Sequence, residues 1–339
     1  MAKNEVLEEA DVGLLAGEEV LTGYVSGNTF TNKPVQYTVV DGLAMFEGCI
    51  VLGTAEEMAA KTQAVEEGES TGIAHSVVIS GDQYRWPNAL VPYTIHTALP
   101  NKARVTNAIK HWTDNTNIRF VERTSSNASQ YPNYVNFRVA TGCWSQVGMQ
   151  GGKQDIGLAN GCSTGSTIHE IGHALGLWHA HSREDRDSFV TIKWANITAG
   201  KEHNFNQHIT DGDDIGAYDY GSIMHYGGKA FSKNGQATIV PKQSGVILGQ
   251  RSKLSKKDIA AIHSIYRTWH YNKTVSRVYT TQHAKNAHVY LSGVGYKKID
   301  PKSNSGVTNM LSGFCEALAN NRKVHVYMDG GSIYRMQLV

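Results

Sequence analysis

Several features that often reveal a protein's role are missing from this sequence of 339 residues. Its 32 Lys and Arg nearly balance its 30 Asp and Glu, so the net charge of +2 gives no sign of a nucleic acid or anionic membrane partner. No apolar run is long enough to span a membrane, and the first residues lack the charged-then-apolar pattern of a signal peptide. There are no convincing repeats or low-complexity tracts. These absences leave a globular chain, whose 40% hydrophobic content supports a proper core.

Cysteine is scarce as well, with four in the chain. Cys143 and Cys162 lie close enough in the sequence to close a short loop, whereas Cys49 and Cys315 are far from each other and from this pair. One bridge with two thiols left over is unusual for a secreted protein. Cys315 falls on the apolar side of an expected helix, which predicts a buried structural thiol.

Histidine, in contrast, is concentrated in TIHEIGHALGLWHAHSREDRD, residues 167–187. His169 and His173 are four residues apart, so on an α-helix they point to the same side. His179 would point away on a continuing helix, but Gly176 allows the chain to turn sharply before it. Three imidazoles that converge in this way form a zinc shell with an open fourth position. Glu170 can reach a water on the metal without binding the metal itself.

The alternative is a helix with ordinary surface histidines. The short motif HExxH occurs by chance in many unrelated chains, but the longer motif HExxHxxGxxH is far rarer. The longer motif is present here, so the sequence favours zinc. His181 and His203 fit no part of this pattern, and we expect them at the surface.

Apolar patterns divide the chain into three parts: residues 1–72, 73–270 and 271–339. The first part is acidic in patches and ends in a short helix followed by a polar, cleavable linker. The second alternates between strand and helix patterns and contains the histidine cluster. The third has strands and a hairpin around one helix, which predicts a small α+β module.

The histidine segment, together with SREDRDSFVTIKWANI and SIMHYG, resembles the astacin family of zinc endopeptidases, a branch of the metzincins, over roughly residues 82–268. The resemblance implies an α+β fold, with a two-lobed catalytic domain built on a twisted sheet and a zinc helix. It also implies one zinc ion per chain, bound by His169, His173 and His179, with Glu170 as the general base. We expect a bacterial-type member in zymogen form.

By the same resemblance, Met224 forms the Met-turn beneath the metal, and Tyr226 can bind zinc at rest and then turn to the tetrahedral intermediate. The chemistry follows from the metal: zinc lowers the pKa of bound water toward about 7. Glu170 takes the water's proton and hands it to the leaving amine, while zinc and Tyr226 hold the oxyanion. The alternative for Tyr226 is a plain core aromatic.

The segment GCWSQVG resembles the family's strand at the edge of the cleft, with Cys143 bridged to Cys162. Such an edge lets an extended peptide pair as another strand, so we expect Trp144 and Ser145 to contact the substrate. The alternative is an ordinary loop with two reduced thiols, which would fit a cytosolic protein.

Three departures from the family pattern stand out. A second disulfide is usual, but Asn117 stands where its first cysteine would precede the Ile-Arg-Phe strand, and no partner follows SIYRTW. The residue after the third histidine is usually a glutamate tied to the new N-terminus, and here it is Ala180. How the mature N-terminus is anchored is therefore open.

The third departure lies in Phe46-Glu47-Gly48-Cys49. Family propeptides often carry Phe-x-Gly-Asp, whose aspartate occupies the open zinc position and keeps the precursor silent. A cysteine thiolate is an even better zinc ligand than a carboxylate. We therefore expect Cys49 to bind zinc in the zymogen only. The alternative is a buried free cysteine.

Gly249-Gln250-Arg251 resembles a segment at the S1′ pocket of those astacins that prefer acidic residues after the scissile bond. A guanidinium there would pair bidentately with an Asp or Glu side chain. Arg251 is therefore a candidate for an acidic P1′ preference. The alternative is a surface arginine on the approach to the final helix of the domain.

These observations predict a latent zinc endopeptidase, activated by another protease or by itself through a cut between residues 62 and 80. We expect protein or peptide substrates, a monomer that is secreted or otherwise exported, and no nucleic acid or membrane partner. A different class of function is a zinc-bearing binding protein that has lost catalysis, with residues 271–339 as the recognition domain. Retention of Glu170 and Tyr226 speaks against it, and the third histidine and the Met-turn disfavour another kind of metal hydrolase.

Overall fold

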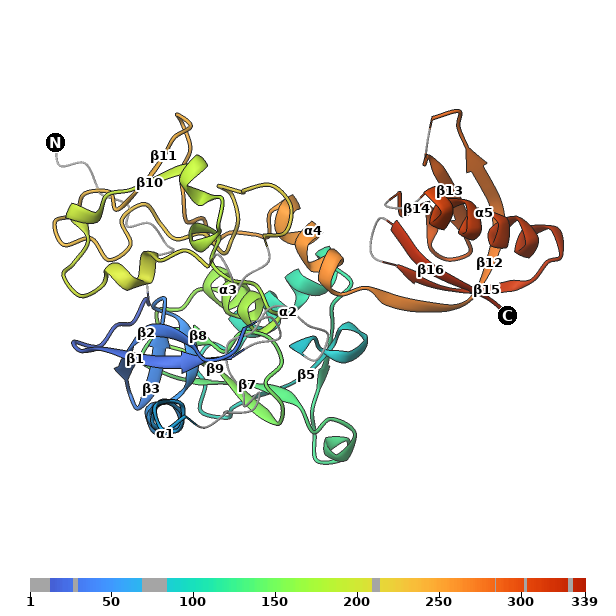
Figure 1. Ribbon diagram of the computed structural model, residues 1–339. Helices are drawn as coiled ribbons and strands as arrows, with labels where there is room; N and C mark the ends of the chain where they lie inside the picture. Colours follow the sequence, from blue (N-terminus) through green and yellow to red (C-terminus); the bar gives the residue numbers. More distant parts are fainter. Residues whose placement is uncertain are drawn as a thin grey trace. The chain divides into compact units, whose positions relative to one another are not determined.

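The computed structural model describes residues 13–26, 30–68, 84–208, 214–283, 285–301, 304–328 and 332–339 (Figure 1). The linker expected to be cut between residues 62 and 80 lies partly outside these ranges. The chain forms two compact units, Met1–Asn115 with Arg119–Ile259 and Thr116–Ile118 with Ala260–Val339. Each is described by itself.

The first unit is built on a nine-stranded mixed sheet in the order β1-β2-β3-β4-β8-β9-β7-β5-β6. The N-terminal segment supplies an antiparallel meander: β1 (Val20–Val25), β2 (Lys33–Val40), β3 (Leu43–Phe46) and β4 (Ile50–Thr54). The rest of the unit supplies β5 (Leu90–Ile95), β6 (Arg119–Glu122), β7 (Tyr134–Val139), β8 (Cys143–Ser145) and β9 (Lys153–Leu158). The α+β class expected from the sequence is confirmed.

Strand β8 joins the two halves of this sheet. It runs antiparallel to β9, and on its other side it pairs in parallel with β4 through Ile50 and Ser145. Without the meander, β8 would be the last strand on its side of the sheet. The edge expected for GCWSQVG is therefore covered by the N-terminal segment.

The short helix expected at the end of the first part of the chain is α1 (Ala55–Glu66), and the expected histidine helix is α3 (Thr164–Ala174). The unit also contains α2 (Ala103–Asn115) and α4 (Lys256–Ile265), which continues into the second unit. α1 starts with a capping box, in which Thr54 and Glu57 bond to each other's backbone N–H. α2 buries Trp112, whose Nε1 donates to the carbonyl of Ile168 in α3 at 3.1 Å. This contact ties α2 to α3, the helix that carries the histidines.

The remainder of the first unit, residues 175–208 and 214–255, is mostly loops, and the loop with Ile223 and Met224 contacts α3. A two-stranded ribbon pairs β10 (Val190–Ile192) with β11 (Ile239–Pro241). The first unit also contains one-turn 3-10 helices, which are Pro87–Ala89, Ala128–Gln130, Ala180–Ser182, Arg186–Ser188, Trp194–Asn196 and Glu202–Phe205.

The second unit is a closed five-stranded barrel in the order β12-β13-β14-β16-β15. Its elements are β12 (Thr268–Thr280), β13 (Ala287–Leu291), β14 (Gly295–Ile299), α5 (Asn304–Ala319), β15 (Lys323–Met328) and β16 (Ser332–Leu338). Strand β12 starts three residues before the expected boundary at residue 271. Figure 1 shows α5 lying against the barrel. Buried Val, Leu, Ile and Phe side chains fill the space between them.

The prediction of a buried thiol in α5 is wrong, because Cys315 is exposed. The buried side chains of this helix are Val307, Phe314 and Ala317. Cys315 follows Phe314 directly, so it is turned by about 100° from that residue, toward solvent. Among the described residues, no helix is both long and apolar enough to cross a membrane.

Candidate metal centre

The histidine segment forms a short helix followed by a sharp turn, as its sequence predicts. The hydroxyl of Ser163 accepts from Ser166 N at 3.0 Å and caps the start of α3. The helix ends at Ala174, and Gly176 adopts a φ of +99°, where a side chain would be strained. The chain then reverses and brings His179 back beside His169 and His173.

Four donor atoms meet at this place: the Nε2 atoms of three histidines and the thiol of Cys49. Nε2 of His173 lies 3.1 Å from that of His169 and 3.2 Å from that of His179. Cys49 Sγ lies 3.6, 3.5 and 3.2 Å from Nε2 of His169, His173 and His179. All four residues are buried.

These spacings fit a tetrahedral zinc ion. Zinc–nitrogen bonds of about 2.0–2.1 Å place two nitrogens about 3.4 Å apart, and a zinc–sulfur bond of about 2.3 Å places sulfur about 3.6 Å from each nitrogen. The observed distances lie within a few tenths of an ångström of these values. A set of three imidazoles and one thiol is also a donor set that zinc favours.

The second ring nitrogens show that each imidazole presents the correct atom to a metal. Nδ1 of His169 bonds to Ile223 O at 2.8 Å and Nδ1 of His173 bonds to Leu177 O at 2.7 Å. A carbonyl oxygen can only accept, so Nδ1 carries the proton and Nε2 keeps its lone pair. Burial lowers the pKa of all three ligand-like histidines, that of His173 to about 3. They are therefore neutral at physiological pH, as metal binding requires.

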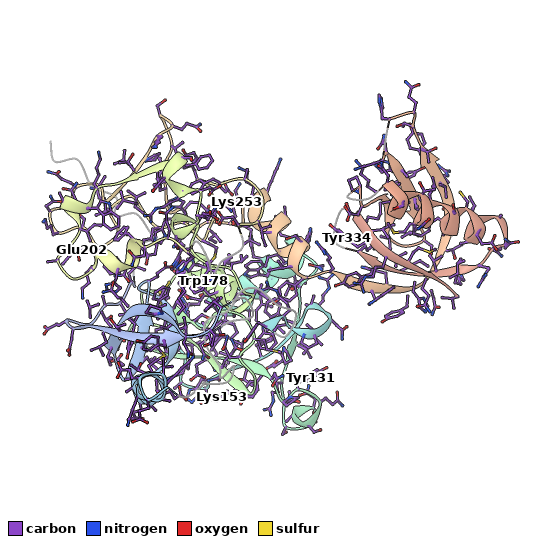
Figure 2. The ribbon with its side chains drawn as sticks, viewed as in Figure 1. Tyr131, Lys153, Trp178, Glu202, Lys253 and Tyr334 are labelled. Carbon is purple, nitrogen blue, oxygen red and sulfur yellow. A yellow bond between two sulfur atoms is a disulfide. The ribbon has the colours of Figure 1, made fainter. Side chains whose placement is uncertain are left out.

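The N-terminal segment supplies the partner for His179. Glu47 is fully buried, and its Oε2 lies 2.7 Å from His179 Nδ1 and 3.2 Å from Ser182 Oγ. Its other oxygen, Oε1, lies 2.8 Å from Nε2 of His208. Trp178, labelled in Figure 2, stacks on His208 with ring centroids 4.7 Å apart. One carboxylate thus connects the metal centre with two other buried side chains.

Glu170 lies next to His169 and is also buried. Its Oε2 finds no hydrogen-bond partner among the described residues, and burial raises the pKa of its carboxyl well above the ordinary value. The residue lines a small cavity together with Cys49, His169 and Arg251. A buried carboxylate oxygen without a partner is costly, so its position beside the donor atoms calls for a functional reason.

Met224 and Tyr226 lie on the loop that supports the histidines. A Cβ at Gly172 of α3 would be 2.7 Å from the sulfur of Met224, so helix and loop are in close contact. Tyr226 is fully buried, its ring centroid is 4.7 Å from that of His179, and its hydroxyl donates to Glu47 O at 2.6 Å. Asp258 stabilises this loop, because its carboxylate accepts hydrogen bonds from Ser222 Oγ at 2.6 Å and from Ile223 N at 2.9 Å.

The N-terminal segment also lies along β8. Cys49 O accepts from Ser145 N at 2.9 Å, and Gly13 O accepts from Cys143 N at 3.4 Å. Trp144 and Ser145, expected to contact substrate, are buried in this arrangement. Cys143 and Cys162 are joined by a disulfide, so the alternative of two reduced thiols is wrong for this structure.

Arg251 is buried, so it is not a surface arginine. Its Nη1 donates to the carbonyls of Ile223, His225 and Gln250 at 2.6, 3.1 and 3.1 Å. The guanidinium thus supports the loop that carries Met224, and it also forms part of the cavity wall beside Glu170. A role in substrate binding stays a prediction.

The expectation that His181 and His203 lie at the surface is wrong, because both are buried. Directly after His179 the chain continues as a 3-10 helix, which places the His181 ring on the ring of Tyr226 with centroids 3.7 Å apart. Spacing alone could not show this contact. The roles of Glu47 and His208 were also missed. Glu47 belongs to the Phe46–Cys49 motif, so its position could have suggested a role in the site. No motif in the sequence points to His208.

Comparison with known proteins gives consistent matches. The family model for the astacin peptidases matches residues 78–267. Blastula protease 10 of Paracentrotus lividus is 38% identical over 232 residues, which cover 65% of this chain and 38% of that protein. Zinc metalloproteinase nas-4 of Caenorhabditis elegans is 40% identical over 190 residues, covering 54% and 59%. The chain thus matches less than two thirds of the length of these curated relatives.

Among solved structures, high choriolytic enzyme 1, a hatching enzyme zinc-protease from the medaka Oryzias latipes, has 37% sequence identity. The match covers 54% of this chain and 92% of that one, with a TM-score of 0.49.

Proposed function

The chain belongs to the astacin family of peptidases, and from this premise we propose that it is a zinc endopeptidase in latent form. The observation that carries the proposal is the convergence of three imidazoles and the Cys49 thiol at tetrahedral spacing. In this proposal His169, His173 and His179 bind one zinc ion. Cys49 is the fourth ligand until the N-terminal segment leaves.

Zinc held there supplies Lewis-acid chemistry for the attack of water on a peptide carbonyl. Glu170 acts as the general base, taking a proton from the attacking water and passing it to the nitrogen of the leaving amine. Its buried carboxylate beside His169, with an oxygen that has no other partner, supports this role. The Tyr226 hydroxyl, once released from Glu47 O, donates to the carbonyl oxygen that becomes negatively charged.

Substrate binding is proposed to replace the N-terminal segment on β8. Ser145 N now donates to Cys49 O, and after removal of the segment it would donate to an extended peptide in the same way. Trp144 and Ser145 would then contact the substrate backbone. This mode of binding depends on main-chain hydrogen bonds and so accepts many sequences.

We infer that residues 1–72 are the inhibitory segment, residues 73–270 the catalytic domain and residues 271–339 a separate small domain. Latency then has two parts, because the segment both binds the metal through Cys49 and occupies Tyr226 through Glu47 O. The disulfide between Cys143 and Cys162 supports export, since such bonds persist in oxidising compartments.

The test is a substitution that removes the base and keeps the ligands. Protein activated by a cut in the 62–80 region is compared with its Glu170→Ala variant for zinc content and for hydrolysis of a peptide library. We expect about one zinc per chain in both, and a loss of hydrolysis by roughly several orders of magnitude in the variant. Glu184→Ala, which removes an exposed carboxylate, is the matched control.

The competing function is a zinc-bearing binding protein without catalysis. It predicts no chelator-sensitive hydrolysis by the activated wild-type protein, whereas the peptidase proposal predicts hydrolysis that stops when zinc is removed. Near-normal activity in Glu170→Ala would show that another group is the base.

A further inference from the structure

The C-terminal barrel has a recognisable topology. Its strands follow the order β12-β13-β14-β16-β15, α5 connects β14 to β15, and β14 runs parallel to β16 (Figure 1). A five-stranded Greek-key barrel with this order and a helix between the third and fourth strands is an OB-fold. Barrels of this kind bind oligonucleotides or oligosaccharides on the face of their second and third strands. Here these strands are β13 and β14.

The outward side chains of this face form a compact set. Ala287, Val289 and Leu291 of β13 are buried in the barrel, so the alternate residues point outward. The strand register places three residues in one row across β12, β13 and β14 and three in the next row. We call these six residues the tyrosine face: Arg277, Tyr290 and Tyr296 in one row, Tyr279, His288 and Lys298 in the other.

The three tyrosines are accessible and lie near one another. Tyr279, Tyr290 and Tyr296 are 56%, 37% and 51% exposed, and their grouping on one face of the barrel, rather than the exposure of any single ring, suits binding. The rings of Tyr290 and Tyr296 meet edge to face with centroids 5.0 Å apart. The ring of Tyr279 lies 6.3 Å from that of His288 in the same row.

The charge of the barrel complements a polyanion. Residues 268–339 contain nine Lys and Arg and three Asp and Glu, a net charge of +6 in a chain whose total is +2. The remaining residues therefore carry a net −4, which hides the basic character of the barrel in the whole-chain value. Arg277 and Lys298 place two of these cations within the tyrosine face, which contains no acidic residue.

We propose that the tyrosine face binds single-stranded nucleic acid. Unpaired bases stack on the exposed tyrosine rings, and Arg277 and Lys298 contact the phosphates along the strand. A sulfated polysaccharide would use the cations but has no bases for the rings. The expectation of no nucleic acid partner rested on the chain's overall charge, which averages two oppositely charged parts.

The test measures binding of a fluorescein-labelled 15-nucleotide poly(dT) to the full-length protein by fluorescence anisotropy. We expect binding that weakens as salt rises, because phosphate contacts release counterions. Each of Tyr279→Ala, Tyr290→Ala and Tyr296→Ala should weaken it by about tenfold, while Tyr296→Phe, which keeps the ring, should stay near wild type. Arg277→Ala should reduce the slope of log affinity against log salt by about 0.7.

Two controls separate the face from the rest of the barrel. Tyr271 is 60% exposed but belongs to the part of β12 that pairs with β15, so Tyr271→Ala should leave binding unchanged. Arg322→Ala removes an equal charge at the turn after α5. The slope of log affinity against log salt should stay nearly the same in this variant as in the wild type. The proposal is overturned if poly(dT) does not bind. It is also overturned if heparin or duplex DNA binds as well as poly(dT) and the tyrosine substitutions change nothing.

Discussion

The carboxylate of Glu47 shows how much one residue can contribute to a site that its own segment is expected to leave. It bonds to a metal-ligand candidate, His179, while its backbone carbonyl accepts from Tyr226. A carboxylate on the far nitrogen of a metal-binding imidazole fixes the ring and raises its basicity. In the proposed latent form, the N-terminal segment would thus both block the centre and help to hold it together.

This double role leads to a prediction for Glu47→Gln in the full-length protein. Glutamine keeps the shape of the side chain but has one acceptor oxygen, so it cannot accept from both His179 and His208. We expect zinc to pass to a chromogenic chelator about ten- to a hundredfold faster than from wild type. Glu56→Gln, an exposed change on α1, is the control and should not alter the rate. Equal rates for both variants would mean that Glu47 has no role in retaining zinc.

Latency is predicted to depend on Cys49. In the full-length protein, Cys49→Ala removes the proposed fourth ligand, so the precursor should cleave itself or a test peptide sooner than wild type. Zinc X-ray absorption of the wild type should show one sulfur neighbour near about 2.3 Å. Cys315→Ala, which removes the other free thiol, should change neither result. A shell of nitrogen and oxygen alone would contradict the assignment.

Specificity is predicted to involve Arg251. If its guanidinium pairs with an acidic P1′ side chain, the preference for Asp over Leu should amount to roughly 1.5–3 kcal/mol, about ten- to a hundredfold in kcat/KM. Because Arg251 also supports backbone carbonyls, the informative quantity is the Asp-to-Leu ratio, which a general loss of activity does not change. Arg251→Ala should abolish the preference, so that the Asp-to-Leu ratio of kcat/KM falls to about one, and Arg251→Lys should lower the ratio. A ratio unchanged in both variants would exclude Arg251 from the P1′ site.

Among whole elements, the helices were predictable and much of the sheet was not. α2 has apolar spacing with a period near 3.6, so local sequence alone reveals its buried face, whereas α3 is buried on all sides and is marked by the spacing of its histidines. The strands β1–β4 lack a regular alternation of buried and exposed residues, and β12 of the barrel is interrupted by register shifts, so alternation does not show them. The pairing of β4 with β8 joins residues nearly a hundred positions apart, and no local pattern encodes such a contact.

The first unit is predicted to depend on the disulfide that links Cys143 of β8 to Cys162, which lies between β9 and α3. Cys143 and Cys162 are separated by 19 residues, so the bond restrains the unfolded chain and should stabilise the unit by about 3 kcal/mol. The double substitution Cys143→Ser and Cys162→Ser should therefore lower the midpoint of thermal unfolding. Adding a reductant should lower the midpoint of the wild type and leave that of the double variant in place. An unchanged midpoint in the double variant would show that β8 is held by its neighbours alone.

At the scale of the whole molecule, the astacin family match and the barrel occupy different parts of the chain. The match ends at residue 267, and β12 begins at Thr268. The resemblance that predicted the metal centre therefore says nothing about the barrel, and whole-chain composition conceals the barrel's charge. The two proposals rest on different residues, so either can fail without affecting the other.

The position of the N-terminal meander at one end of the sheet has a consequence for reversibility. β4 meets β8 through one registered pair, so the other strands keep their neighbours when the meander leaves. If the segment is inhibitory as proposed, an uncut chain would present it to its site at an effective concentration on the order of millimolar. A single cut would turn it into a separate molecule, diluted by the surroundings, and rebinding would become a rare bimolecular event. Activation would then run in one direction without further expenditure of energy.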